Sequence, residues 1–419
     1  MTPEVKQRIE QIRQGIVPKG YKKTKTDIVP ADWKESPIGE YIREYTEKTT
    51  IPNQYPVLTS ARTGLMLQTD YYSNRQVTTE DNVGYNILPY GYITFRSRSD
   101  DGRFRFNENR IIERGVISYF YPVFSFSEEV CHEYMLYLLN FSIYRRMYPY
   151  AEGTAQQVLS LKKLGQLKYS LPLVAEQKKI AEILSTQDKA IELQGRKIEE
   201  LKRFKKGCLE KMFPRKGQKV PEKRFPGFTD DWEQRKAKEL FVSTTDKGYP
   251  ELPVLSATQD RGMIRRDENS INIFHDKKNE AGYKRVLPGQ FVIHLRSFQG
   301  GFAHSAIEGI TSPAYTVFGF SEPEKHDSEY WKYVFTSKSF IQRLETVTYG
   351  IRDGRSISYE EFLTLGFVYP SKAEQTAIAR YLDKLSDLIT LHQRKLEEMK
   401  RQKKALMQLL LTGIVRVKA

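Results

Sequence analysis

The sequence predicts an α+β protein with two mixed α/β units in tandem, each followed by one long helix. Two observations lead to this fold class. A charged stretch with a heptad pattern begins at Glu176 and recurs without a gap 198 residues later, at Glu374. The segment before each copy mixes short runs of β-branched and aromatic residues with amphipathic stretches, which is typical of α/β or α+β domains.

The chain is long enough for more than one domain. Its 419 residues, of which 39% are hydrophobic and 12% aromatic, exceed the usual size of a single core. The repeat and the composition between its copies indicate where the domains end. We predict an N-terminal helical extension (1–30), a first globular unit (31–173), a central helix (174–213), a linker (214–229), a second globular unit (230–371), and a C-terminal helix with its tail (372–419).

Three features bear on the cellular location. No uninterrupted apolar run approaches the roughly 18 residues that a membrane helix needs. The N-terminal sequence MTPEVKQRIEQIRQG is polar and lacks the apolar core of a signal peptide. The two cysteines, Cys131 and Cys208, lie far apart without CxxC spacing, which argues against a disulfide framework and a zinc site. We therefore expect a soluble, cytoplasmic protein with reduced thiols.

The N-terminal extension shares a short motif with the end of the chain. Gly15-Ile16-Val17 resembles Gly413-Ile414-Val415. This three-residue similarity suggests that the N-terminal piece completes the last helical unit, which would make the pattern circular about a pseudo-twofold axis.

The two helical stretches are copies of each other, as a search for internal repeats shows. The first reads EQKKIAEILSTQDKAIELQGRKIEELKRFKKGCLEKMF and the second EQTAIARYLDKLSDLITLHQRKLEEMKRQKKALMQLLL. Identical pairs include Glu176/Glu374, Gln177/Gln375, Ile180/Ile378, Ala181/Ala379, Leu184/Leu382, Ile191/Ile389, Arg196/Arg394, Lys197/Lys395, Glu199/Glu397, Glu200/Glu398, Lys202/Lys400, Arg203/Arg401, Lys205/Lys403 and Lys206/Lys404. Chance does not produce so many matches in one register.

Each copy predicts one long helix. Apolar residues fall seven apart at Leu184, Ile191 and Ile198, and the second copy has the same pattern. At about 1.5 Å per residue such a helix is roughly 55 Å long, comparable to some sixteen base pairs of duplex DNA.

One seam position in each helix is polar, Gln194 in the first copy and His392 in the second. If the helices pack antiparallel about a pseudo-twofold axis, equivalent residues meet only at the centre, and residue 194 is the midpoint of the first copy. We predict that Gln194 and His392 face each other and fix the register. Alternatively, one or both point to solvent, and a side-chain separation above about 8 Å would exclude the pairing.

The segments before the helices repeat more faintly. Asp32-Trp33 corresponds to Asp231-Trp232, and Arg96-Ser97 corresponds to Arg296-Ser297. Just before the helices, SLKKLGQLKYSLP corresponds to SYEEFLTLGFVYP. The interiors have diverged strongly, as expected of a shared scaffold that carries two different recognition surfaces. Strands are expected at 92–95 and 290–295, amphipathic helices at 133–144 and 329–344, and an extended linker in PRKGQKVPEKRFPGF.

The motifs of common catalytic sites are missing from the sequence. It contains no GxxxxGK[ST] phosphate loop, no GxGxxG after a strand and no HExxH. His294 and His304 lie ten residues apart, a spacing that is more often structural than metal-binding. We also find no adenine-methyltransferase motif of the Asn/Asp-Pro-Pro-aromatic type and no nuclease carboxylate cluster. We expect neither catalysis nor a bound cofactor or metal in this chain.

Basic residues beside the expected strands are the candidate DNA contacts. Arginine suits bidentate contact with guanine edges and phosphates, and interleaved aromatic residues can hold such loops rigid. For any single residue a salt-bridged surface role is the stronger alternative, whereas for the group DNA contact is favoured. The candidates are Arg62, Arg96, Arg98, Arg103 and Arg105 in the first unit and Arg261, Arg265, Arg266, Lys284, Arg285 and Arg296 in the second, with weaker phosphate-contact candidates Gly153, Thr154, Lys162, Lys163, Arg352, Gly354 and Arg355.

The net charge of +15 points to a polyanionic partner. Residues 196–224 hold twelve Lys or Arg against four Glu, and residues 394–418 hold eight against two. Nearly all the excess therefore lies in or beside the helices. A charge run is usually a solvated face, so three assignments stay open for this charge: DNA, a protein partner or neither.

These residues resemble the specificity (S) subunit family of type I restriction-modification systems. The resemblance rests on RFPGFTDDWEQRK at 224–236, on the pre-helix SLP and VYP segments, and on the repeated EQ…KIEELK…KK and EQ…KLEEMK…KK helices. It covers essentially the whole chain, although the extension through Pro30 is longer than a minimal scaffold needs. It implies two target-recognition domains, each reading one half of a bipartite DNA target, on helices that form an antiparallel coiled coil.

The resemblance also implies partners. Two methyltransferase subunits, which carry S-adenosylmethionine, would dock on the helical parts, and two translocating restriction subunits would complete the nuclease. This chain would be a non-catalytic specificity subunit that binds double-stranded DNA and no membrane. An alternative from another class is a coiled-coil adaptor whose globular ends bind proteins, and a third is a stand-alone DNA enzyme, which the missing motifs disfavour. A steep fall of DNA affinity with salt would distinguish the first hypothesis from the second.

Overall fold

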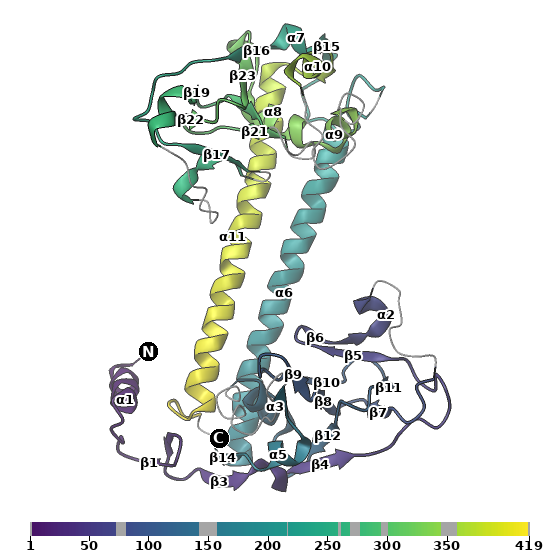
Figure 1. The fold of residues 1–419 in the computed structure, drawn as a ribbon, viewed down its shortest axis with the longest axis vertical. Coiled ribbons are helices and arrows are strands. Elements are labelled where there is room, and N and C mark those ends of the chain that lie inside the picture. Colours follow the sequence, from purple (N-terminus) through teal and green to yellow (C-terminus); the bar gives the residue numbers. More distant parts are fainter. Residues whose placement is uncertain are drawn as a thin grey trace. The chain divides into compact units, whose positions relative to one another are not determined.

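The computed structural model describes residues 2–72, 81–141, 157–215, 217–258, 261–268, 277–294, 301–344 and 358–417. It divides into two compact units (Figure 1): unit 1 comprises Met1–Gln194 and Lys395–Ala419, and unit 2 comprises Gly195–Arg394. Two long helices, α6 (Val174–Met212) and α11 (Lys372–Leu411), each contribute one end to each unit. Each predicted long helix is therefore one continuous helix.

Unit 1 holds the N-terminal part of the chain up to the first half of α6. Its other elements are α1 (Pro3–Arg13), β1 (Tyr21–Lys23), β2 (Ile28–Pro30), β3 (Lys34–Pro37), η1 (Ile38–Glu40), β4 (Ile42–Tyr45), β5 (Leu58–Ala61), β6 (Gly64–Leu67), α2 (Gln68–Tyr71), β7 (Asn86–Pro89), β8 (Ile93–Phe95), β9 (Arg98–Ser99), β10 (Phe106–Glu108), β11 (Arg114–Ile117), β12 (Val123–Phe126), α3 (His132–Phe141), β13 (Gln157–Val158), α5 (Leu161–Gly165) and β14 (Lys168–Leu171).

Unit 2 is built from the chain between the two long helices. Its other elements are β15 (Glu233–Lys236), α7 (Ala237–Leu240), β16 (Phe241–Thr244), β17 (Leu255–Thr258), β18 (Gly262–Arg265), η3 (Arg266–Glu268), η4 (Lys277–Gly282), β19 (Lys284–Val286), β20 (Phe291–Ile293), β21 (Phe302–His304), β22 (Gly309–Thr311), β23 (Thr316–Phe320), η5 (Pro323–Lys325), α8 (Ser328–Thr336), α9 (Lys338–Leu344), α10 (Tyr359–Leu363) and β24 (Gly366–Tyr369). The described residues between Met212 and Glu233 form no helix or strand, as the linker composition predicted.

The two units have the same sheet topology although their interiors differ in sequence. The main antiparallel sheet has the order β10-β8-β12-β4 in unit 1 and β21-β20-β23-β16 in unit 2, so the strands correspond one to one. Three strand pairs correspond as well: β14–β3 with β24–β15, β11–β7 with β22–β19, and β5–β6 with β17–β18. The predicted strands at 92–95 and 290–295 are the central strands β8 and β20.

The core of each unit includes residues of both long helices. In unit 1, Phe95 and Phe124 of the sheet form one cluster with Ile180 and Leu184 of α6 and with Leu410 and Leu411 of α11. In unit 2, the matching cluster joins Phe291 and Phe318 to Met212, Ile378 and Leu382. Burying one such side chain contributes roughly 1.5–3 kcal/mol. The repeated apolar residues thus attach each globular part to the helices.

Within each unit the two helices run antiparallel. In unit 1, Gln187 Nε2 donates to the carbonyl oxygen of Met399 at 3.3 Å, and Asp188 pairs with Lys403. In unit 2, Lys205 Nζ donates to Ser386 Oγ at 2.7 Å, and Cys208 and Tyr381 line the same pocket. In unit 2 the higher residue number on α6 thus meets the lower one on α11. In unit 1 the earlier Ile180 and Leu184 share a cluster with Leu410 and Leu411, whereas the later Gln187 meets Met399.

The N-terminal extension is only partly helical, which corrects the prediction for residues 1–30. Helix α1 ends at Arg13, and residues 21–30 form the antiparallel pair β1–β2. Gly15 ends the helix with φ +75°, a left-handed conformation that glycine adopts without strain. Pro18 could not continue the helix, because proline has no backbone N–H and its ring clashes with the preceding turn.

The extension contacts the end of α11, as the repeated Gly-Ile-Val motif suggested. Tyr21 Oη donates to the carbonyl oxygen of Gly413 at 2.8 Å, and Arg8 donates to that of Ile414 at 2.6 Å. Gly413 has φ +72°, and a Cβ there would lie 2.5 Å from Pro30 Cδ. Both Gly-Ile-Val motifs thus begin with a left-handed glycine just beyond a helix, and the second glycine is also required by close packing.

Candidate nucleic-acid interface

Unit 1 presents a cluster of aromatic and arginine side chains at the loop between β11 and β12. The guanidinium of Arg98, on β9, lies 4.2 Å from the centroid of the Phe120 ring. Tyr119 packs on Phe120 at 4.1 Å between centroids and is 56% exposed. Tyr85 contacts Tyr119 edge-on at 5.9 Å. We call Arg96, Arg98, Tyr119 and Phe120 the aromatic–arginine cluster.

Hydrogen bonds to its backbone hold this loop. Ser97 Oγ donates to the carbonyl oxygen of Phe120 at 2.5 Å, and Asn86 Nδ2 donates to that of Tyr121 at 2.9 Å. Thr94 Oγ1 donates to the carbonyl oxygen of Pro122 at 2.9 Å. Because the loop is fixed through its backbone, the exposed ring of Tyr119 and the two arginines have a defined place.

Arg96 and Arg98 are exposed, and no described carboxylate forms an ion pair with either. Burial raises the pKa of Tyr121, and the nearby positive charge of Arg96 opposes this shift. Both arginines are among the candidates predicted from the sequence, and Tyr119 is not. The run Tyr119-Phe120-Tyr121 between two strands was the available signal, because adjacent residues of a short loop cannot all be buried.

Two other predicted arginines of unit 1 meet at one carboxylate. Arg62 Nη2 lies 2.6 Å from Asp101 Oδ1, and Arg103 Nε lies 4.0 Å from Asp101 Oδ2. The backbone N–H of Arg103 also donates to Asp101, and this bond, with those from Ser99 and Arg62, lowers the pKa of Asp101. Arg62 and Arg103 are therefore brought together, with their charge partly neutralised.

The remaining candidates of unit 1 lie elsewhere. Burial lowers the pKa of Arg105, and the negative charge of Asp188 on α6 opposes this shift. Arg105 therefore lies near the long helix α6. Lys162 is exposed and Lys163 half-buried in the short helix α5, whose N-cap Ser160 accepts from the Lys163 backbone N–H. Gly153 and Thr154 lie outside the described residues.

In unit 2 the predicted cations are more firmly engaged. Arg285 pairs with Glu308 at 2.5 Å and with Asp246 at 3.4 Å, and it stacks on Tyr249 at 4.5 Å. Its bonds to Glu308 and Asp246 raise the pKa of Arg285. Lys284 Nζ donates to the carbonyl oxygen of Tyr315 at 2.6 Å. The side chains of Lys284 and Arg285 therefore stabilise the region around the strand pair β19–β22.

The other candidates of unit 2 are less informative. Arg261 is exposed, Arg265 lies 3.7 Å from Asp267, and Arg266 is half-buried at the end of the β17–β18 hairpin. Arg296, Arg352, Gly354 and Arg355 lie outside the described residues. Gln194 belongs to unit 1 and His392 to unit 2, and their pairing stays a prediction.

His294 and His304 lie at opposite ends of a strand pair rather than in a shared site. His304, on β21, pairs with Phe291, and His294 follows the end of β20. Among the described residues, no group of three or more His, Cys, Asp or Glu side chains could hold a metal ion. Likewise, no helix in the described part of the chain is long and apolar enough to span a membrane.

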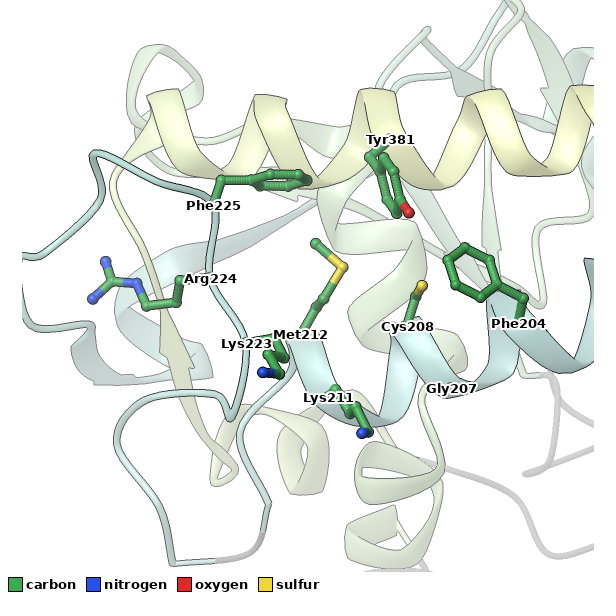
Figure 2. Close-up of a pocket in the computed structure, with 9 residues that line it drawn as sticks. All are labelled: Phe204, Gly207, Cys208, Lys211, Met212, Lys223, Arg224, Phe225 and Tyr381. Atoms are coloured by element: carbon green, nitrogen blue, oxygen red, sulfur yellow. The ribbon is translucent and has the colours of Figure 1, made fainter.

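A groove on the helical part of unit 2 is the second candidate site. Figure 2 shows it between the end of α6, the linker and Tyr381 of α11. The cavity of about 400 Å³ is lined mainly by apolar atoms, with Phe204, Cys208, Met212, Phe225 and Tyr381 around it. Phe204 is 54% exposed. Lys211 and Lys223 lie at its edge, where Lys211 is 3.4 Å from Glu222; Arg224 also lines it but is paired with Glu374.

Comparison with known proteins identifies related sequences. Residues 30–203 match the family model of the type I restriction modification DNA specificity domain. The type I restriction enzyme MjaVIII specificity subunit of Methanocaldococcus jannaschii is 25% identical, over 93% of this chain and 94% of its own length. The putative MjaX specificity subunit of the same organism is 24% identical over 68% of both chains.

Two solved structures share the fold. A chain from a structure that addresses complex assembly and conformational transition of the type I R-M system gives a TM-score of 0.54 at 14% identity, covering 92% of this chain and 99% of that chain. The type I restriction-modification S subunit from M. genitalium gives a TM-score of 0.52 at 13% identity, covering 96% of this chain and 100% of its own. The tandem arrangement predicted from the repeat is thus the fold of these proteins.

Proposed function

Because this chain belongs to the specificity subunits of type I restriction-modification systems, we propose that it reads a bipartite DNA target, one half with each unit. One observation carries the proposal. The two units share their topology and their attachment to the helices, yet the exposed cations and rings on them differ. A common scaffold with two different surfaces suits two different half-sites.

In unit 1, the aromatic–arginine cluster is the proposed DNA contact. Arg96 and Arg98 supply donors for phosphates or guanine edges, and an exposed ring such as Tyr119 can pack on a thymine methyl or a sugar. Arg62 and Arg103, already held by Asp101, would serve phosphates at most. The sequence and structure together thus favour two of the five arginines predicted for this unit.

The role is non-catalytic. The motifs that phosphate hydrolysis, methyl transfer and metal-assisted cleavage require are missing from the sequence, and the proposed contacts only bind and position DNA. Methylation and cleavage would come from two methyltransferase subunits, carrying S-adenosylmethionine, and two restriction subunits. This chain would supply the sequence choice.

Two measurements test the DNA-reading role. Affinity for target DNA should fall steeply as salt rises, because neutralised phosphates release counterions; an adaptor protein would show no such binding. Exchanging residues 31–173 for the same domain of another specificity subunit should change one half of the methylated target and leave the other. A change in both halves would refute the two-headed model.

The groove of Figure 2 is the proposed docking position for one methyltransferase subunit. It lies on the helical part rather than on the strand pairs β17–β18 and β19–β22, which carry or adjoin the described DNA-contact candidates of this unit. An exposed ring beside a cavity can anchor a side chain of the partner. The lysines at the edge favour acidic residues around that side chain on the partner surface. By the 198-residue correspondence, Ile183 and Leu406 of unit 1 match Tyr381 and Cys208, and Ile183 is 37% exposed, whereas Phe204 is matched by the polar Gln402. Two positions would accommodate two copies of one partner.

Phe204→Glu tests this position. The variant should weaken methyltransferase assembly by at least about tenfold, since an anchor residue is replaced by a charge. Val242→Glu is the matched control, because Val242 is 49% exposed in the same unit but on strand β16. Equal loss in both variants, measured by sedimentation with the methyltransferase, would show that the groove is not the docking position.

A further inference from the structure

A single carboxylate joins three helices in unit 1. Tyr137 on α3 donates its hydroxyl to Asp188 Oδ2, on α6, at 2.7 Å. Lys403 on α11 lies with Nζ 2.5 Å from Asp188 Oδ1 and 5.4 Å from the centroid of the Tyr137 ring. The globular part and both long helices therefore meet at Asp188.

Unit 2 has a related arrangement, in which the repeated lysine contacts a serine beside the tyrosine and the carboxylate pairs with a different lysine. Tyr333 on α8 donates its hydroxyl to Asp383 Oδ1, on α11, at 2.7 Å, and lies 3.2 Å from Ser386 Oγ. Lys205 on α6 donates to Ser386 Oγ at 2.7 Å, with Nζ 5.3 Å from the Tyr333 ring centroid. A tyrosine, a carboxylate and a lysine again come from three different helices.

The repeat register shows that the carboxylate has moved, whereas the tyrosine and the repeated lysine keep their places. Lys205 and Lys403 are an identical pair, 198 residues apart. At the same spacing Asp188 corresponds to Ser386, and Ser185 corresponds to Asp383. Aspartate and serine have thus exchanged places between two positions three residues apart, which lie on the same face of a helix. An exchange that keeps one carboxylate beside the tyrosine indicates that the carboxylate is required.

The two tyrosines also occupy matching places in their own helices. Each follows by six residues the residue whose backbone N–H donates to the repeated glutamine: Cys131 to Gln177 at 2.8 Å, and Asp327 to Gln375 at 2.9 Å. The glutamine contact holds the start of the globular-domain helix (α3 or α8) against the long helix. The tyrosine contact holds the same helix at a second point, about two turns further along. Two points of attachment determine the direction of that helix.

These contacts are partly shielded from solvent. The Lys403 side chain is 22% exposed and that of Asp188 41%. Burial lowers the pKa of Lys205, and the positive charge of Lys332 adds to this shift. Lys332 lies 2.7 Å from Asp383 and supplies a second cation in unit 2. Lys205 and Lys403 thus differ from the solvated lysines of the same helices.

We propose that each tyrosine–carboxylate–lysine cluster is a positioning device, which holds the recognition domain at one orientation on its own pair of helices and thereby helps to set the spacing at which the half-sites are read. This inference rests on the proposed DNA-reading function. Tyr137, Asp188 and Lys403, with Tyr333, Asp383 and Lys205, are positioning residues. Two of the repeated basic residues therefore serve the scaffold and not DNA.

The test uses the full chain assembled with its methyltransferase subunits and duplexes carrying the target found by mapping methylated adenines in the host. Companion duplexes have a spacer one base pair longer or shorter. Asp188→Ser should reduce the preference for the native spacer by at least about tenfold, the effect expected for one hydrogen bond to a charged group. The half-site sequences should remain unchanged. Tyr137→Phe, which removes only the hydroxyl, should act in the same direction.

The exchange seen between the two units provides the rescue. The double variant Ser185→Asp, Asp188→Ser places the aspartate and the serine as in unit 2 and should restore the preference. Lys403→Met should relax it, whereas Lys404→Met, one residue along on the exposed face, should not. A uniform loss of affinity for all spacers, or failure of the rescue in a folded complex, would overturn the proposal. Loss of half-site specificity in the unaltered complex would instead refute the proposed function.

Discussion

The ends of the long helices and the loops of the globular parts show opposite outcomes of the same duplication. At the helix ends, Glu374 of α11 accepts two hydrogen bonds from Arg224 at 2.9 and 2.7 Å, and Glu176 of α6 accepts two from Arg416 at 2.8 and 2.7 Å. Each arginine follows the opposite long helix in sequence. Each ion pair therefore joins the start of one long helix to the segment that follows the other long helix.

The glutamines beside these glutamates agree as closely. Gln177 Nε2 donates to the carbonyl oxygen of Pro172 and Gln375 Nε2 to that of Pro370, both at 2.9 Å. In the loops, by contrast, Arg98 stacks on a ring and Arg285 is held by two carboxylates. The comparison shows that the attachment to the helices is repeated down to single hydrogen-bonding atoms, whereas the cations of the two globular parts are held in different ways.

The largest effect is expected at the buried ion pairs. Arg224→Met leaves the Glu374 carboxylate, 1% exposed, without its partner and should destabilise unit 2 by about 3 kcal/mol. Arg416→Met should cost less, because the Arg416 side chain is 37% exposed. Urea unfolding measures both, and Arg235→Met, an exposed arginine, should leave the unfolding midpoint unchanged. If Arg224→Met behaved like that control, the helix ends would not be the constrained region.

The repeated glutamines should respond equally in the two units. Gln177→Ala and Gln375→Ala each leave a backbone N–H and a carbonyl oxygen without their side-chain partner, which should cost about 2 kcal/mol. Amide hydrogen exchange can report each unit separately. Values that differ by more than about 1 kcal/mol would mean that the two attachments are not equivalent.

The loop arginines should respond unequally. Arg98→Ala should weaken binding of the assembled complex to its target about tenfold, as expected for a lost base or phosphate contact. Arg285→Ala should change it less than about threefold, since Glu308 and Asp246 already occupy that guanidinium. Fluorescence anisotropy at fixed salt decides between them. The reverse order would place the DNA contact of unit 2 at β19–β22.

Acid should affect the two units in different pH ranges. Burial lowers the pKa of His304, despite Glu329 nearby, and burial also lowers that of His326. The unfolded state then binds more protons, so unit 2 should lose stability as pH falls below about 6.5 and reach a plateau once the folded-state histidines are protonated. His326→Phe should weaken this dependence in thermal unfolding.

In unit 1 the corresponding range lies lower. Burial alone would raise the pKa of Glu108, but hydrogen bonds from His132 and Arg110 outweigh it and lower the pKa. Its contribution to stability is complete above the unfolded-state value of about 4.3 and is lost as pH falls through the lower folded-state pKa. Simultaneous acid unfolding of both units, unchanged by His326→Phe, would contradict this difference.

Much of the architecture could be predicted from the repeat, because heptad spacing and identical residues report helices directly. The contacts of the loops could not. Arg62 and Arg103 are predicted DNA contacts like Arg98, but the structure also places the carboxylate of Asp101 beside both of them. Lys205 looked like part of a solvated charge run, yet its partner Ser386 lies 181 residues away. Sequence spacing says little about which charges meet across a fold.

The sequence by itself determined the duplication, the two long helices and the separation of scaffold from recognition surface, since these depend on local periodicity and on matching residues. Only the tertiary structure decided that both interiors form the same sheet, β10-β8-β12-β4 and β21-β20-β23-β16, from sequences with few residues in common. The physical reason is that a sheet needs buried apolar side chains of suitable volume at alternating positions and not particular residues. Which cations remain available for a ligand depends on where the carboxylates of distant segments come to lie.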